Sequence, residues 1–284
     1  MASGQGAPTC PTATSGGAGD DVHIGTTGAD NLRGLDGNDL ISLLTGADCA
    51  DGGAGDDIIN GGLDDDTLLG GDGIDTVNGA AGSDAIQGNE GADELSGGSD
   101  DDRILGGTGF NLVEGGLGAD TIVGGPDLDD LGGGRGDDNI RAGDGFDFLF
   151  GGLGNDALRG EDGPDDLEGS RGSDRLYGGD GQDYVEGGLG NDVIIGGAGP
   201  DRIEGGLGRD RIRRRGRGRH RRRPGQQHHQ GWLRRRPHPG RQRPSRPHLL
   251  RVGSRHGDRR PERPHRALRG RARPLNPARR GMAG

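Results

Sequence analysis

Aspartate recurs at every ninth residue over most of this 284-residue chain, and glycines stand at fixed distances before it. Written in nines from Gly16, residues 16–213 form 22 repeats without an insertion. Asp occupies position 6 in 21 of them, and Gly occupies position 1 in 20 and position 4 in 19. Carboxylates and the carbonyls of glycine-rich loops are oxygen ligands, which select hard divalent cations. The spacing therefore indicates metal binding.

The ligand type favours calcium among these metals. Flexible loops with many carbonyls suit Ca²⁺ better than Mg²⁺, which demands near-octahedral geometry and retains water. Zn²⁺ is disfavoured because the repeats contain no thiol or imidazole cluster, and His23 is their only histidine. Turn formation alone is the competing explanation for the aspartates, but it does not fix Asp at one position of a nine-residue frame.

Each repeat reads as a loop followed by a strand. A Gly-Gly-x-Gly segment forms a tight turn because glycine adopts positive φ angles without steric cost. The last three positions, as in residues 193–195 (VII), predict a short strand whose central side chain points inward. That central residue, at position 8, is Val, Ile or Leu in all repeats except those of His23 and Ala50. Uninterrupted repeats of this kind stack as a solenoid with parallel strands in neighbouring turns.

Charge and composition show what such a solenoid needs. Residues 1–213 carry 44 acids against 11 Arg, a balance of −33, and only 27% of the whole chain is hydrophobic. Turns ~4.8 Å apart would place equivalent aspartates in columns of like charge. A conventional core, a membrane-spanning helix of ~20 apolar residues and a collagen repeat are all excluded. Cohesion must come from cations between the turns.

The repeats at residues 151–159 (GGLGNDALR) and 178–186 (GGDGQDYVE) follow the pattern GGxGxDxUx, in which U is a large aliphatic residue. This pattern resembles the RTX, or haemolysin-type, calcium-binding repeat, over 198 of 284 residues. The resemblance implies an all-β fold, a right-handed parallel β-roll with two repeats per turn. It also implies multiple Ca²⁺ ions between adjacent loops, each shared by position-6 aspartates 18 residues apart and by loop carbonyls. The ligands predicted in this way are Asp57, Asp75, Asp84, Asp93, Asp102, Asp120, Asp138, Asp147, Asp156, Asp165, Asp174, Asp183, Asp192, Asp201 and Asp210.

Several repeats depart from the pattern. Residues 43–51 (LLTGADCAD) lack the leading glycines, and Ala50 is expected to leave the core thin there. Asn111 removes a carboxylate from two predicted sites. Residues 124–132 form a poor repeat, whereas residues 133–213 are the most regular. Position 4 is Asp instead of Gly in three repeats, with strain or an added ligand as the expected result, at Asp64, Asp100 and Asp127. Three phenylalanines alternate along one segment and are expected to pack on the roll, namely Phe146, Phe148 and Phe150.

Residues 214–284 have the opposite composition, with 24 Arg against two acids, nine Pro and seven His. We expect a disordered Arg/Pro/His-rich tail. Three interpretations stay open. Out-of-frame translation of further repeats is favoured, because in a GC-rich gene a shifted frame turns codons for Gly, Asp, Ala and Val into Arg codons. A tail that binds nucleic acid or another polyanion is the second interpretation, and a solvated linker is the third.

Residues 1–15 are expected to be a flexible leader without the charged and apolar regions of a signal peptide. Cys10 and Cys49 are the only cysteines, and both a disulfide between them and two free thiols stay open. Millimolar extracellular calcium suits weak sites, and the resemblance implies export. We therefore expect a secreted or surface protein from a bacterium, without a membrane span.

No nucleophile and base stand in a catalytic pattern, so we expect no enzymatic activity. The leading hypothesis is a calcium-binding roll that folds when Ca²⁺ binds. The alternatives are a C-terminal or fragmentary module of a larger secreted enzyme, toxin or adhesin, and nucleic-acid binding through residues 214–284. The sequence indicates no protein partner.

Overall fold

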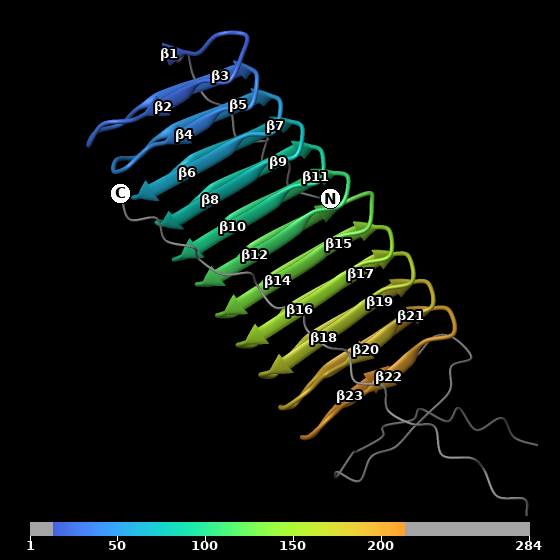
Figure 1. Ribbon diagram of the computed structural model, residues 1–284. Helices are drawn as coiled ribbons and strands as arrows, with labels where there is room; N and C mark the ends of the chain where they lie inside the picture. The colour runs from blue at the N-terminus through green and yellow to red at the C-terminus, as the bar shows by residue number, and fades with distance from the viewer. Residues whose placement is uncertain (1–13, 214–284) are drawn as a thin grey trace, which may run out of the picture. The chain divides into compact units, whose positions relative to one another are not determined.

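A computed structural model describes residues 14–213 of the chain (Figure 1). This range contains strands and turns without a helix, and so it has no helix long and apolar enough to cross a membrane. The predictions for residues 1–13 and for the tail at 214–284 lie outside the described residues. Thr14 and Ser15, at the end of the predicted leader, form the first strand of the fold.

The strands form two parallel sheets, and the chain crosses from one sheet to the other at every repeat. Sheet A contains β1 (Thr14–Ser15), β3 (Asn31–Asp36), β5 (Cys49–Ala54), β7 (Thr67–Asp72), β9 (Ala85–Glu90), β11 (Arg103–Thr108), β13 (Thr121–Gly125), β15 (Asn139–Asp144), β17 (Ala157–Asp162), β19 (Arg175–Asp180), β21 (Val193–Ala198) and β23 (Arg211–Arg213). Sheet B contains β2 (Val22–Ile24), β4 (Leu40–Ser42), β6 (Ile58–Leu63), β8 (Thr76–Ala81), β10 (Glu94–Ser99), β12 (Leu112–Leu117), β14 (Asp130–Arg135), β16 (Phe148–Leu153), β18 (Asp166–Arg171), β20 (Tyr184–Glu186) and β22 (Arg202–Glu204).

Two repeats make one turn, so the 22 repeats build a solenoid of about 11 turns. Figure 1 shows its strands stacked in sequence order, with a narrow turn after each strand. The predicted all-β parallel solenoid is confirmed. Each strand pairs with the strand two further along the chain in a constant register of 18 residues, as when Leu149 faces Leu167. The register is strict because a slip by one residue would turn every inward aliphatic side chain outward.

Most strands are longer than the three residues that the sequence predicts. β21, expected at residues 193–195, continues to Ala198 and so includes positions 1–3 of the next repeat. The glycines at these positions lack side chains and let adjacent turns stay in hydrogen-bonding contact. The only residues left between consecutive six-residue strands are positions 4–6, which place the aspartate immediately before the next strand.

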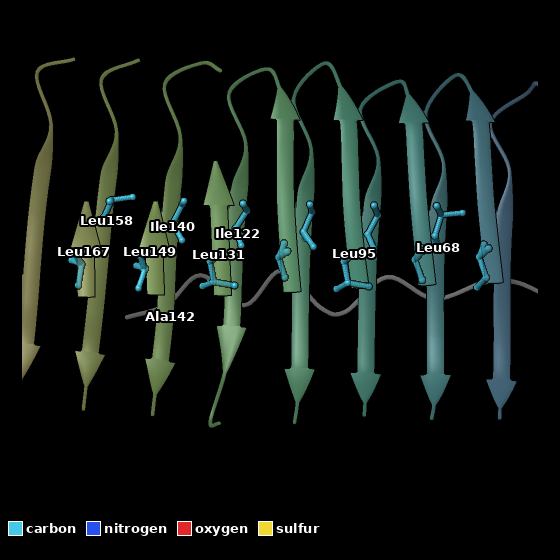
Figure 2. Close-up of a cluster of buried hydrophobic side chains, with 14 of the residues drawn as sticks. Leu68, Leu95, Ile122, Leu131, Ile140, Ala142, Leu149, Leu158 and Leu167 are labelled. Carbon is cyan, nitrogen blue, oxygen red and sulfur yellow. The ribbon is translucent and has the colours of Figure 1, made fainter. Parts of the chain in front are cut away.

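The core is a double column of position-8 aliphatic side chains between the sheets. Figure 2 shows Leu131, Leu149 and Leu167 from sheet B beside Ile122, Ile140 and Leu158 from sheet A. All of them are at most 2% exposed. Because each sheet contributes one position-8 side chain per turn, the core is one side chain thick on each side and continuous along the solenoid axis.

The thin core expected around Ala50 is not what the structure contains. Leu43, which replaces the position-1 glycine of the same repeat, is fully buried and belongs to the core cluster together with Ala50. Position 1 faces inward in every regular strand, and so Leu43 supplies the large aliphatic group that Ala50 lacks. Cys49 is also buried and is not a free thiol, and its possible partner Cys10 lies outside the described residues.

The phenylalanines expected to pack on the roll remain open to solvent. Phe146, Phe148 and Phe150 are 43%, 39% and 47% exposed. Phe148 and Phe150 occupy positions 7 and 9 of their repeat, which point away from the core because strand side chains alternate between faces. Phe146 contacts Phe148 edge to face, with ring centroids 4.9 Å apart.

We expect Leu158→Ala to lower the free energy of unfolding of the calcium-loaded protein by about 2–5 kcal/mol, because it leaves a cavity in a filled column. Leu189→Ala is the matched control, since Leu189 is 47% exposed, and it should change this free energy by about 0.5 kcal/mol or less. Urea denaturation in saturating calcium measures both. Equal losses in the two variants would contradict the one-aliphatic core.

Candidate functional site

The narrow turns owe their shape to left-handed backbone at positions 2 and 4. Gly188 and Gly190, at these positions of one repeat, have φ angles of 97° and 148°. A methyl group on Gly190 would also overlap the carbonyl oxygen of Gly172, one turn earlier. Glycine is therefore required at such a position 4 by backbone conformation and by the close approach of adjacent turns.

The position-6 aspartates form two ladders along the turns, one at each edge of the roll. The backbone N–H of Asp156 donates to Asp174 Oδ1 at 2.9 Å, and the N–H of Asp174 donates to Asp192 Oδ1 at 3.0 Å. The same hydrogen bond links aspartates 18 residues apart through most of the roll. The structure thus brings together, pair by pair, the residues that the sequence predicts to share ions.

The second carboxylate oxygen of these aspartates has no hydrogen-bond partner, although the side chains are buried. Oδ2 is the unpartnered oxygen in all of the predicted ligands except Asp201. These ligands are Asp57, Asp75, Asp84, Asp93, Asp102, Asp120, Asp138, Asp147, Asp156, Asp165, Asp174, Asp183, Asp192 and Asp210. In the remaining one, Asp201, the unpartnered oxygen is Oδ1. Burying an unpaired carboxylate oxygen is costly, so each turn contains a place where a cation would be stabilising.

Backbone carbonyl oxygens lie next to these orphaned carboxylate oxygens. A methyl group at Gly160 would overlap Asp165 Oδ2, and it would lie only 2.5 Å from the carbonyl oxygen of Gly178 in the next turn. The same convergence of one carboxylate and one carbonyl recurs at Gly169, where the two groups belong to Asp174 and Gly187. Position-1 glycines therefore keep side chains out of the space that these oxygens face.

Burial raises the pKa of the position-6 carboxyls. For Asp174 it is raised from 3.8 to about 7, chiefly by burial, while the N–H of Asp156 lowers it and the charges of Asp156 and Asp192 raise it. For Asp165 burial is again the largest cause, and its pKa reaches about 6. The columns therefore hold carboxylates that resist ionisation near neutral pH without a positive partner.

The donor set fits a calcium ion. Within residues 14–213, no three acidic, imidazole or thiol side chains gather around one point. A cation here would take one carboxylate oxygen from an aspartate and further oxygens from loop carbonyls and water. Ca²⁺ accepts six to eight oxygen ligands in flexible geometry, whereas the absence of nitrogen and sulfur ligands disfavours Zn²⁺.

Asn111 separates the two roles of the position-6 side chain. Its Oδ1 accepts from the N–H of Asp93 at 3.2 Å, and its own N–H donates to Asp129 Oδ1 at 2.9 Å. Its Nδ2, which takes the place of the unpaired carboxylate oxygen of the aspartates, donates to the carbonyl of Gly109 at 3.2 Å. The ladder therefore continues through Asn111 while the negative charge is missing.

The position-4 aspartates form hydrogen bonds that the sequence does not predict. Asp64 Oδ2 accepts from the N–H of Gly46 at 3.1 Å, and Asp127 Oδ2 accepts from the N–H of Gly109 at 2.8 Å. Asp64 and Asp100 have φ angles of 76° and 80°, which are left-handed, but Asp127 does not. The expected strain is thus present at two of the three positions.

Sequence reasoning omitted four further position-6 aspartates that the structure treats alike. Each is buried with Oδ2 unpartnered, and they are Asp39, Asp48, Asp66 and Asp129. Their place in the nine-residue frame was the signal for them. At the first turns the pattern changes, because Asp21 Oδ2 accepts from the N–H of Gly17 and Asp30 Oδ2 accepts from Thr26.

A second ladder at position 5 was also missed. Asp137 Oδ1 accepts from the N–H of Asn155 at 2.7 Å, Asn155 Oδ1 from that of Ser173 at 2.9 Å, and Asn191 Oδ1 from that of Arg209 at 3.0 Å. These bonds need no metal. Short polar residues at 18-residue spacing were the signal for this ladder.

Together, the fold and the site define a parallel β-solenoid with buried, partly unpaired carboxylate columns in its turns. The family model of the RTX calcium-binding nonapeptide repeat matches the chain in overlapping segments, at residues 15–48, 44–77, 69–104, 96–131, 132–167, 159–194 and 186–214. No curated protein matches the chain. Because the matched segments cover more than half of the sequence, the chain belongs to the RTX repeat family, and its repeats imply calcium binding in a β-roll.

We expect Gly190→Ala to destabilise the calcium-loaded protein by about 1–3 kcal/mol, because alanine is strained at this φ and meets a carbonyl oxygen. Gly28→Ala is the matched control at the same repeat position. Gly28 has no atom within 4 Å of an added Cβ and no left-handed φ, so its substitution should cost about 0.5 kcal/mol or less. Urea denaturation in calcium measures the free energy of unfolding of both variants. Equal losses in the two variants would contradict the turn geometry.

We expect the metal-free protein to lose stability as the pH rises from about 4 to about 7. The folded pKa values of about 6 for Asp165 and about 7 for Asp174 exceed the ordinary value of 3.8. The folded chain therefore binds more protons than the unfolded chain in this window, and that stability is lost as the carboxyls ionise. Denaturation in EDTA at several pH values measures the trend. A metal-free stability that increases with pH across this window would contradict it.

Proposed function

We propose that this protein is a calcium-dependent folding module in which multiple Ca²⁺ ions bind between successive turns. The observation that carries the proposal is the row of buried aspartate oxygens without hydrogen-bond partners, most of which lie near a backbone carbonyl of the next turn. Membership of the RTX repeat family supports calcium as the ion.

Binding and folding are linked in this proposal because the ligands of each ion come from turns that are adjacent only in the folded roll. Asp174 and Asp192, for example, are 18 residues apart in sequence but hydrogen-bonded in the structure. An unfolded chain has no such preformed site, and so the free energy of calcium binding is also free energy of folding.

We further propose that the module acts outside the cell and has no catalytic activity. Sites of this kind suit millimolar extracellular calcium, because each has few charged ligands. The buried carboxylates are the groups that this proposal assigns to calcium, so they would not be free to act as catalytic acids or bases.

Far-UV circular dichroism of the purified protein tests the central proposal. In EDTA at neutral pH the spectrum should lack β structure, and millimolar CaCl₂ should restore it reversibly. MgCl₂ at the same concentration is the control and should restore less, because Mg²⁺ requires octahedral geometry. A cooperative β fold in EDTA, or no change on adding calcium, would refute the proposal.

Asp174→Asn removes the negative charge of the side chain but keeps the hydrogen-bond acceptor of the aspartate ladder. Asparagine can still accept the N–H of Asp156 through Oδ1, as Asn111 does for Asp93. We therefore expect an intact fold in saturating calcium, with fewer ions bound by titration calorimetry and a severalfold higher calcium concentration at the folding midpoint. Asp180→Asn is the matched control at an exposed position at the end of β19, and its midpoint should stay unchanged. Indistinguishable midpoints would remove Asp174 from the site.

A further inference from the structure

The two sheets differ in the charge of two rows of side chains on their outward faces. Positions 7 and 9 of each repeat point away from the core, and we call these side chains the outward rows. In β3–β23 of sheet A the outward rows contain a single acid, Asp51, and seven arginines, a balance of +6: Arg33, Arg103, Arg141, Arg159, Arg175, Arg211 and Arg213. The strands of sheet A also contain seven exposed acids outside these rows, at position 2 (Glu161) and at position 3 (Asp36, Asp72, Glu90, Asp144, Asp162 and Asp180).

Sheet B has the reverse composition. Its outward rows contain a single arginine, Arg202, and seven acids, a balance of −6: Glu94, Glu114, Asp130, Asp166, Glu168, Glu186 and Glu204. None of these acids is buried. On both sheets most of the charge of the outward rows lies between β10 and β23. The two charged regions are therefore similar in length and opposite in sign.

Charges of one sign lie side by side within each face. Arg141 is the register partner of Arg159 on sheet A. On sheet B, Glu186 lies between Glu168 and Glu204 in the same row. Like charges directly opposite each other on neighbouring strands are destabilising, and these rows repeat the arrangement over successive turns.

Internal ion pairs neutralise only part of this charge. Arg141 lies 3.3 Å from Glu161, and Arg202 lies 2.7 Å from Glu204. Within residues 14–213, Arg103 and Arg175 have no carboxylate at ion-pair distance, and Glu114 and Asp130 have no basic group at that distance. Each face therefore keeps charge that a partner of opposite sign would stabilise.

We propose that sheet A of one copy of this protein docks on sheet B of a second copy. The complementary outward rows identify the partner, because a second copy supplies the opposite charge at the same strand spacing. Complementary potentials of this kind steer association and fix its register.

The size of the faces is sufficient for such an interface. Sheets of 11 or 12 strands ~4.8 Å apart extend about 50 Å, and a six-residue strand extends about 20 Å. Each copy would thus contribute about 1,000 Å², within the range of stable protein–protein interfaces. Both faces also hold exposed apolar groups for the interface centre, with Tyr177 on sheet A and Leu112 and Phe150 on sheet B.

The geometry makes the assembly open-ended. The two docking faces differ, so the contact is heterologous, and each added copy leaves one face of each kind free. The proposal rests on the proposed function, since calcium must neutralise the turn carboxylates before copies with a balance of −33 in residues 1–213 can approach.

Sedimentation velocity of the full chain, with circular dichroism of the same samples, tests the proposal. In millimolar calcium at low salt, the weight-average mass should rise with concentration beyond twice the monomer mass of 29.2 kDa. It should return to the monomer mass in about 1 M NaCl, where charges are screened beyond about 3 Å. A chain that shows no β signal in calcium contradicts the proposed function, whereas a folded chain that stays monomeric at low salt contradicts only the docking.

Charge reversal identifies the faces. The first variant combines Arg141→Glu, Arg159→Glu and Arg175→Glu, which changes the balance of the sheet A rows from +6 to 0. The second combines Asp130→Arg, Glu168→Arg and Glu186→Arg, which changes the balance of the sheet B rows from −6 to 0. Each variant alone should sediment as a monomer, because one of its two faces has lost its net charge. An equimolar mixture should form 1:1 pairs, because sheet A of the second variant keeps +6 and sheet B of the first variant keeps −6.

Arg135→Glu combined with Arg171→Glu is the matched control, since these exposed arginines are the last residues of β14 and β18 and lie outside the outward rows. This variant should associate as the parent does. The docking is overturned if reversal of either face leaves association unchanged, or if the mixture stays monomeric. One further result would overturn the docking. If the parent is monomeric and only the second variant changes its sedimentation, residues 214–284 of the same chain cover the acidic face instead of a second copy.

Discussion

The buried aspartate columns are the constraint on which the rest of the structure depends. Each position-6 side chain uses one oxygen to hold the backbone of the preceding turn, as Asp174 does for Asp156. Its other oxygen is left without a hydrogen bond in a buried place. The ladder that aligns the turns thus also concentrates negative charge between them, and raised pKa values of about 7 at Asp138 and Asp174 express this conflict. A cation between the turns resolves it without disturbing the ladder.

The glycine pattern follows from the same constraint. Turns must approach closely for one aspartate to reach the next, and position 1 must remain free of a side chain where the carboxylate and the carbonyl oxygens converge, as at Gly160. The thin core also follows, because closely stacked repeats of nine residues leave room for one inward aliphatic side chain each. Leu43 and Ala50 illustrate the tolerance of this arrangement, since a large residue at position 1 accompanies a small one at position 8.

The periodic features were predictable from sequence, and the features that depend on relations between turns were less so. A nine-residue frame with Asp at position 6 and an aliphatic at position 8 predicts the solenoid and its parallel strands. The length of β21 was not predictable, because Gly-Gly-x indicates a turn and only the neighbouring turn keeps it in the sheet. Phe148 and Phe150 were assigned to packing because of their hydrophobicity, whereas strand alternation places them outside.

The position-5 ladder makes the two edges of the roll unequal. In its C-terminal half, the turns that lead from sheet B to sheet A are tied by Asp137, Asn155 and Asn191 through bonds that require no ion. The opposite turns carry Phe146 and Pro164 at the equivalent places, and neither side chain can accept a hydrogen bond. The turns of that opposite edge do have position-5 bonds in the N-terminal half, at Asn38 and Asp56. A falling calcium concentration would therefore separate the turns first along that edge of the C-terminal half. Partial unloading would then yield a hinged intermediate rather than a uniformly loosened coil.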